Sequence, residues 1–141
     1  MGPEREEAFR VTGPRDFGLN LDLDALRAQA VRLLVVFGSW ARGTATARSD
    51  LDVGVLFGRG EVGLEERAAI LGALGSPVEV GLAVLDGADP LLLYEVALDA
   101  QPVYEDHPGA FEEFRLLAVK RYWDTAWFRR LEAGALKARL G

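Results

Sequence analysis

The chain has 141 residues, half of them apolar, which is enough for one hydrophobic core and indicates a single domain over 1–141. Its net charge of −6, from 22 acidic and 16 basic residues, argues against a long nucleic acid as partner, because phosphate backbones are held by clustered Lys and Arg. The absence of cysteine excludes disulfides, zinc–thiolate sites and thiol nucleophiles.

The N-terminal segment predicts neither a leader peptide nor a membrane anchor. It begins MGPEREEAFR, with acids where a signal peptide needs a basic and then an apolar run. No apolar stretch in the chain reaches the roughly eighteen residues of a membrane span. We therefore expect a cytoplasmic protein with no membrane partner, and we expect residues 1–20 to form an irregular lead-in.

Hydrophobic patterning predicts two helices and two strands in the first part of the chain. Residues 22–32 carry apolar side chains at helical spacing. The apolar run at 33–37 ends at a glycine and predicts a buried strand, and residues 51–57 predict a second one. Between them, residues 39–43 predict a short helix.

Alternation of helices and strands continues to the C-terminus. Asp89 and Pro90 predict a helix start, with Asp as the cap and Pro at the first helical position. The other predicted elements are a helix at 61–74, a strand at 78–85, a small edge strand at 103–105 and a long helix at 109–134. We expect an α+β fold with a small mixed β-sheet flanked by helices, rather than a doubly wound sheet.

The loop after the first strand has features of a phosphate site. Gly38 lets the backbone turn sharply and lets an anion approach without a Cβ in the way. Ser39 offers a hydroxyl and a backbone N–H at a helix start, where the helix dipole favours a negative group. Ser49 lies in the same loop. A Gly-Ser pair alone is equally an ordinary turn with an N-cap, so the phosphate interpretation depends on the carboxylates of the next strand.

Two carboxylates open that second strand. Asp50 and Asp52 are two residues apart, so both project from one face while Leu51, Val53 and Val55 project into the core. Paired carboxylates repel each other and lose hydration, which a magnesium ion bound to a substrate phosphate would offset. The alternative is that Asp50 caps the strand entry and Asp52 is exposed to solvent.

A third carboxylate is needed for a second metal ion or as a base, and Glu79 on the third strand is the candidate. Gly54 lies two residues beyond Asp52, and Gly81 lies two residues beyond Glu79, so each acid shares its face with a glycine. This pattern favours either room for a ligand or close packing of a neighbouring element.

At these residues the chain resembles the minimal nucleotidyltransferases of the DNA-polymerase-β superfamily. The resemblance covers roughly residues 22–105 and is carried by three short motifs, Gly38-Ser39, Ala41-Arg42-Gly43 and Ser49-Asp50-Leu51-Asp52. It implies a polymerase-β palm-like fold, ATP as substrate and Mg²⁺ as cofactor.

The resemblance also implies residue roles. Gly38 and Ser39 correspond to the triphosphate-binding pair, and Asp50 and Asp52 to the metal ligands. Glu79 falls where the family has its third acid, which is normally Asp.

Three further residues are candidates for the nucleotide. Arg42 either contacts phosphate or braces the loop, and Arg48 is a triphosphate candidate or a surface charge. Ser49 completes the predicted nucleotide-binding set.

Many proteins of this size and type resemble the MNT-type antitoxins of two-gene modules, whose partners are helical HEPN ribonucleases. The resemblance implies transfer of AMP from ATP to a tyrosine of such a toxin. Two alternatives stay open. The first is a non-catalytic module that neutralises its partner by contact, and the atypical Glu79 is the feature that suggests it. The second is a nucleotidyltransferase that acts on a small molecule of the aminoglycoside type.

The last predicted helix is apolar on more than one side. One side closes the domain, while the side around Trp123 and Trp127 either docks a partner or a second copy of the chain, or is buried by the sheet and neighbouring helices. A homo-oligomer through this helix is therefore one expectation.

Overall fold

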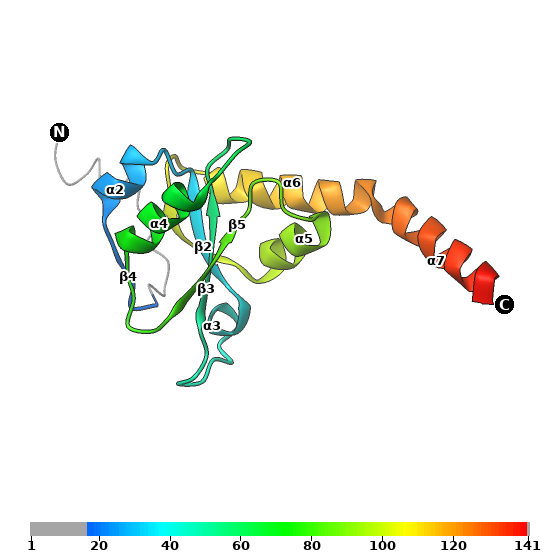
Figure 1. Cartoon of the computed structure of the whole chain (residues 1–141), viewed down its shortest axis with the longest axis horizontal. Coiled ribbons are helices and arrows are strands. Elements are labelled where there is room, and N and C mark those ends of the chain that lie inside the picture. Colours follow the sequence, from blue (N-terminus) through cyan, green and yellow to red (C-terminus); the bar gives the residue numbers. More distant parts are fainter. Residues whose placement is uncertain (1–16, 141) are drawn as a thin grey trace.

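The centre of the molecule is a mixed four-stranded sheet, in a computed structural model that describes residues 17–140 (Figure 1). The strand order is β5–β3–β2–β6, formed by Val80–Val84, Leu51–Leu56, Leu33–Phe37 and Gln101–Glu105. Strand β2 pairs antiparallel with β3 and β6, whereas β3 pairs parallel with β5. The predicted α+β fold is confirmed. Most of the predicted lead-in, residues 1–16, lies outside the described residues.

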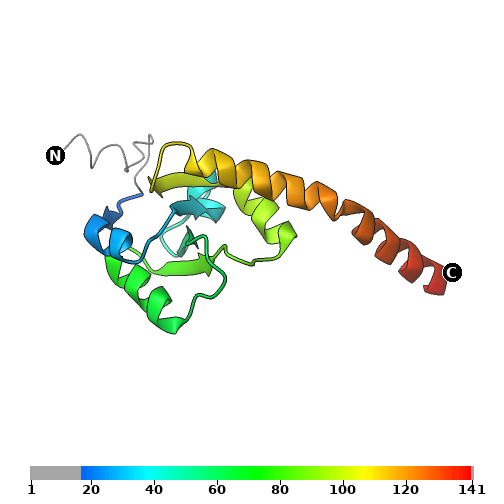
Figure 2. The same ribbon diagram turned by 90° about the horizontal axis from the view of Figure 1, so that it is seen from above.

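Helices flank both faces of this sheet, as Figures 1 and 2 show from two directions. They are α2 (Leu23–Ala28), α3 (Gly38–Arg42), α4 (Leu64–Ala73), α5 (Pro90–Asp99), α6 (Ala110–Asp124) and α7 (Ala126–Leu140). Helix α7 runs on from α6 and projects away from the sheet. Within residues 17–140, every helix is too short or too polar to cross a bilayer.

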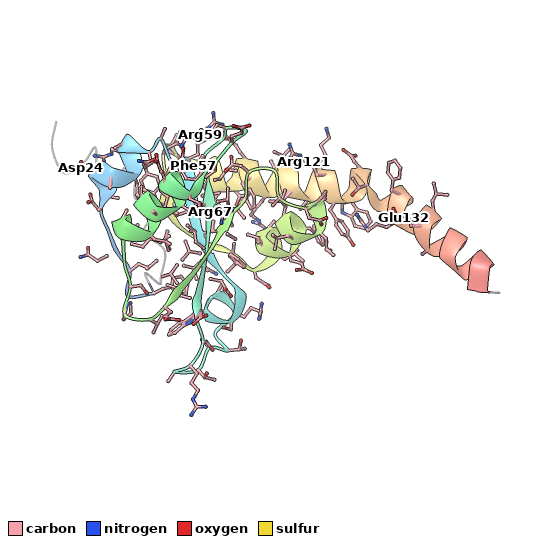
Figure 3. The ribbon with its side chains drawn as sticks, viewed as in Figure 1. Asp24, Phe57, Arg59, Arg67, Arg121 and Glu132 are labelled. Carbon is pink, nitrogen blue, oxygen red and sulfur yellow. The ribbon has the colours of Figure 1, made fainter. Side chains whose placement is uncertain are left out.

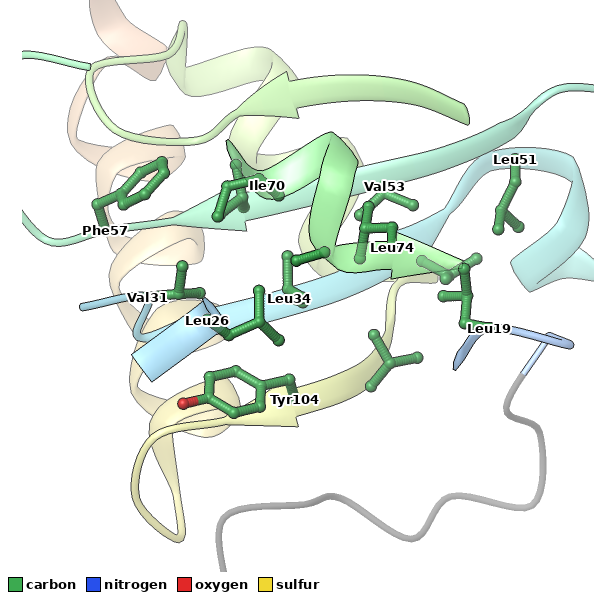
Figure 4. Packing of buried hydrophobic residues seen from close by; sticks show 14 of the residues in the cluster. Leu19, Leu26, Val31, Leu34, Leu51, Val53, Phe57, Ile70, Leu74 and Tyr104 are labelled. Carbon is green, nitrogen blue, oxygen red and sulfur yellow. The ribbon is translucent and has the colours of Figure 1, made fainter. Parts of the chain in front are cut away.

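Alternation along the strands divides the core into two apolar clusters. Leu34 and Val36 of β2 face one side, where they join a cluster that includes Leu26 of α2 and Ile70 of α4 (Figure 4). The intervening residues of β2 face the other side and pack with α5 and α6 through a second cluster that includes Phe114. Because successive strand residues point to opposite faces, a fully apolar strand such as β2 is buried on both.

Local capping explains where two of the helices begin. The Asp89 carboxylate accepts the backbone N–H of Leu91 at 2.7 Å, and Pro90 occupies the first helical position of α5, as predicted. Helix α4 begins three residues later than the predicted start at 61. The backbone N–H of Gly63 donates to the Glu66 carboxylate at 2.9 Å, which fixes that start.

Helix α2 is shorter than the predicted 22–32. Gln29 ends it, and the next residue, Ala30, has a left-handed φ of +55° that a continuing helix does not allow. Two short strands, β1 (Asn20–Leu21) and β4 (Leu74–Gly75), pair antiparallel and were not predicted. They are two residues long and carry no periodicity.

The predicted single helix over 109–134 is instead two helices that meet at Thr125. The Thr125 hydroxyl donates to the carbonyl oxygen of Arg121 at 3.0 Å or of Tyr122 at 3.1 Å. The guanidinium of Arg129 donates to the Tyr122 carbonyl at 2.9 Å and lies over the Tyr122 ring. Side chains thus occupy the Tyr122 carbonyl, which the backbone of a continuous helix would use.

Candidate active site

The side chain of Asp52 lies at the point where β2 passes into α3. In the antiparallel register Asp52 is opposite Phe37, the last residue of β2. Gly38 is the next residue and has a φ of +73°, and a Cβ on it would overlap Oδ2 of Asp52. The turn therefore requires glycine twice, once for its backbone conformation and once for the space that the carboxylate occupies.

The other oxygen of the same carboxylate lies against β5. Asp52 is paired with Gly81 in the parallel register, and a Cβ on Gly81 would lie 3.3 Å from Oδ1 of Asp52. The carboxylate is thus held between two glycines, Gly38 at the start of α3 and Gly81 in β5. Gly54 is different, because its Cα faces the Val35 and Leu85 side chains, and close packing is the interpretation that fits it.

Burial is the largest influence on Asp52 and raises the pKa of its carboxyl. The charge of Asp50 raises this pKa further, and the guanidinium of Arg42 partly opposes the shift. Asp50 itself is exposed, one residue before β3 begins, so the pair consists of a half-buried and an exposed carboxylate. A divalent ion bound to both carboxylates would offset the repulsion between them.

A network of hydrogen bonds fixes the loop that carries Asp50. The indole Nε1 of Trp40, in α3, donates to the carbonyl oxygen of Ser49 at 3.1 Å. The Ser49 hydroxyl accepts the backbone N–H of Thr46 at 2.9 Å. In this structure the Ser49 hydroxyl closes a turn, and its predicted contact with the nucleotide stays a prediction. The roles of Trp40 and Thr46 were not predicted, because their partners lie in a loop without periodicity.

The two predicted arginines differ in their surroundings. Arg42 lies 3.3 Å from the Asp99 carboxylate at the end of α5, an ion pair that braces α3 against α5. No sequence signal connects residues 57 positions apart. Arg48 is exposed on the loop before Asp50.

The Ser39 carbonyl accepts the backbone N–H of Thr44 at 2.9 Å and so closes the α3 turn.

Glu79 lies beside the carboxylate pair along the backbone but does not complete it. Its carbonyl oxygen accepts the backbone N–H of Leu51 at 2.8 Å, which places it next to Asp50 in the register. Its side chain is exposed. Among residues 17–140, no three Asp, Glu or His side chains converge as a set that could hold a metal ion.

The sequence matches the nucleotidyltransferase domain family over residues 22–125. No curated protein matches the chain.

Solved structures share the fold. A toxin–antitoxin crystal structure with AMP-PNP has 20% identity and a TM-score of 0.62, covering 82% of this chain and 94% of that chain. A tri-AMPylated Shewanella oneidensis HEPN toxin in complex with MNT antitoxin has 20% identity and a TM-score of 0.58, covering 82% of this chain and 92% of that chain. The toxin–antitoxin MntA-HepT gives the same four values.

The family match includes β2, α3 and β3, and therefore the Gly38 turn and both aspartates. The chain belongs to the nucleotidyltransferase domain family and has the fold of its minimal, MNT-type members.

Proposed function

We propose that this chain is a magnesium-dependent nucleotidyltransferase that transfers AMP from ATP to a tyrosine hydroxyl of a HEPN-type toxin, and so acts as the antitoxin in the cytoplasm. The observation that carries the proposal is the Asp52 carboxylate, held between Gly38 and Gly81 beside Asp50. The neighbouring structures support it, because one contains AMP-PNP and another contains a tri-AMPylated HEPN toxin with an MNT antitoxin.

Asp50 and Asp52 repel each other, and their carboxylates are suitable ligands for a magnesium ion. Magnesium takes one or two carboxylates and completes its octahedron with water and substrate phosphates. When bound, the ion would neutralise charge on the triphosphate and on the leaving pyrophosphate. Gly38 allows the turn that brings the start of α3 against the Asp52 carboxylate, where the phosphates would bind, and Arg48 is the exposed cation proposed to reach them.

The transfer is an in-line displacement at the α-phosphorus. The tyrosine oxygen forms a bond to the α-phosphorus. At the same time, the bond breaks between this phosphorus and the oxygen that bridges the α- and β-phosphates. Pyrophosphate leaves with the electron pair of the broken bond. The tyrosine proton passes to a carboxylate of the site, for which Glu79 is the candidate base because it lies beside Asp50 in the sheet register.

The test uses α-labelled ATP, magnesium and a candidate helical partner protein of the HEPN type. We expect label on the partner with the wild type and none with the Asp50→Asn/Asp52→Asn variant. Asp24→Asn is the matched control, because the Asp24 side chain is 96% exposed on α2, away from the site. Equal labelling by the double variant and the wild type would defeat the proposal.

Nucleotide binding has a separate test that needs no partner. Calorimetry of ATP should show binding that depends on magnesium and disappears in the Asp50→Asn/Asp52→Asn variant. Thermal melts should show that this variant stays folded, since it removes like-charge repulsion.

One observation favours a second candidate function, neutralisation of the partner by contact alone. The exposed Glu79 side chain does not join the aspartate pair in a group that could hold a metal ion within residues 17–140. Co-expression decides between the two functions. Suppression of the toxin by the double Asn variant as complete as by the wild type would support contact, whereas renewed toxicity would support transfer.

A further inference from the structure

A cavity lies at the end of the sheet opposite to Asp52. Its volume is about 390 Å³. It is lined by residues at the start of β2 and the ends of β3 and β5, together with residues of α5 and α6. Because the carboxylate pair lies at the other ends of β2 and β3, this cavity is separate from the candidate active site.

The cavity has an apolar floor. Leu85, Leu93, Phe114 and Ala118 line it and are buried in the second apolar cluster. Leu117 lines it as well and is 47% exposed. A concave surface of this size with an apolar lining is typical of sites for small organic molecules.

Three arginines from different elements surround this floor. Arg32 precedes β2, Arg59 follows β3 and Arg121 lies on α6, with Arg59 and Arg121 labelled in Figure 3. None of the three has an ion-pair partner within residues 17–140. Arg59 instead lies over the Phe57 ring, 4.8 Å from its centre.

The acids that line the cavity are already engaged. The Asp86 carboxylate accepts the backbone N–H groups of Phe57, Gly58 and Arg59 at 2.8, 2.6 and 3.2 Å. The Glu113 carboxylate lies 3.0 Å from Nε2 of His107.

These hydrogen bonds hold the two carboxylates but do not cancel their charges, so the three arginines give the lining a net excess of one positive charge, not counting His107. A local positive excess contrasts with the chain's net charge of −6.

We propose that this cavity binds a small organic anion, a molecule with a phosphate or carboxylate group on an apolar or aromatic body. The arginines supply planar, multi-donor partners for the anionic group, and the leucines and Phe114 receive the body. The site is independent of the transfer reaction at Asp52.

The test follows backbone amide signals by NMR in ¹⁵N-labelled full-length protein without magnesium. The probes are phenyl phosphate, benzoate and inorganic phosphate. Gly58, Gly60 and Gly87 line the cavity and report binding there, whereas Gly38 and Gly81 report the Asp52 site. We expect saturable shifts of the cavity glycines with phenyl phosphate or benzoate, and the tighter of the two probes identifies the anionic group.

Variants test the arginines. Arg59→Ala/Arg121→Ala should weaken binding of the tighter probe by about tenfold, because two charge-assisted contacts are lost. The control is Arg67→Ala, which removes an exposed arginine of α4 outside the cavity. The proposal is overturned if shifts occur only at Gly38 and Gly81, if inorganic phosphate binds as tightly as the aromatic probes, or if the double variant binds like Arg67→Ala.

Discussion

Gly38 is the residue on which the candidate active site most depends. Replacement by Ala forces a left-handed backbone on an L-residue, which costs about 1–2 kcal/mol. The new Cβ would also displace the Asp52 carboxylate. We expect Gly38→Ala to lower the free energy of unfolding by at least this amount and to abolish magnesium-dependent ATP binding, as measured by urea denaturation and calorimetry.

Gly72 provides the matched control for this prediction. It lies inside α4, and a Cβ on it would meet no atom within 4 Å. Gly72→Ala should leave ATP binding unchanged and raise stability by up to about 1 kcal/mol, because alanine favours a helix. If the two variants behave alike, the geometry of the Gly38 turn is not what holds the site.

The raised pKa of Asp52 predicts how stability depends on pH. A carboxyl whose pKa is higher in the folded than in the unfolded chain binds more protons when folded, so its ionisation opposes folding. Without magnesium, Asp52→Asn should be more stable than the wild type near neutral pH. The difference should shrink as the pH falls through the raised pKa toward the ordinary value of 3.8.

Thermal melts of both proteins in a metal chelator, between about pH 4 and 7, measure this difference. Asp24→Asn is the control, since it makes the same substitution on α2, away from Asp52. A constant difference between wild type and Asp52→Asn across the range contradicts the prediction.

Among the helices and strands, α3 positions the loop before β3 through a single indole. Trp40→Phe removes the hydrogen bond to the Ser49 carbonyl while keeping an aromatic ring. One such bond contributes about 1 kcal/mol, so we expect ATP–magnesium affinity to fall by roughly fivefold. Hydrogen exchange of residues 44–50 should also become faster.

Trp123→Phe is the control for this change, because Trp123 is 58% exposed on α6 and far along the chain from the loop. Unchanged exchange in the loop of the Trp40→Phe variant would exclude a positioning role for the indole. A fall in affinity without faster exchange would also contradict it.

Some helices begin or end at capping residues that can be recognised in the sequence, whereas others end because of side-chain contacts that form only in the folded chain. The Asp89–Pro90 start of α5 was predictable because both cap residues are adjacent in sequence. The break between α6 and α7 was not, because apolar periodicity continues across Thr125 while Arg129 and the Thr125 hydroxyl take the carbonyls near it.

At the scale of the whole molecule, α7 contributes no described residue to the hydrophobic core. Within the described residues, the two apolar clusters contain nothing beyond Ala118. A chain ending at residue 125 should therefore unfold at nearly the same urea concentration as the full chain and keep its ATP binding. Equilibrium denaturation measures this, and a large loss of stability in the shortened chain would contradict it.

The same shortened chain tests self-association. Trp123, Phe128 and Leu131 are 58%, 53% and 60% exposed, so the alternative that the sheet and neighbouring helices bury this surface does not hold for them. The side chain of Trp127 lies outside the described part of the structure. If a second copy covers this surface, the full chain should sediment as a dimer or larger and the shortened chain as a monomer. Monomers in both cases would exclude the homo-oligomer.

Local sequence was sufficient to predict the succession of the main strands, the Gly38-Ser39 turn and the spacing of Asp50 and Asp52. These features depend on backbone preferences and on two-residue alternation, which are written in neighbouring residues. The resemblance of these motifs to the nucleotidyltransferases predicted the family and its fold, and both are confirmed.

Which of the predicted residues meet was set by the folded chain alone. Folding holds Asp52 between Gly38 and Gly81, pairs Arg42 with Asp99, and leaves the side chain of Glu79 exposed. It also brings three arginines from separate parts of the sequence to one cavity: Arg32, Arg59 and Arg121. Such contacts join residues that are tens of positions apart, and strand pairing and helix packing set them rather than any local pattern.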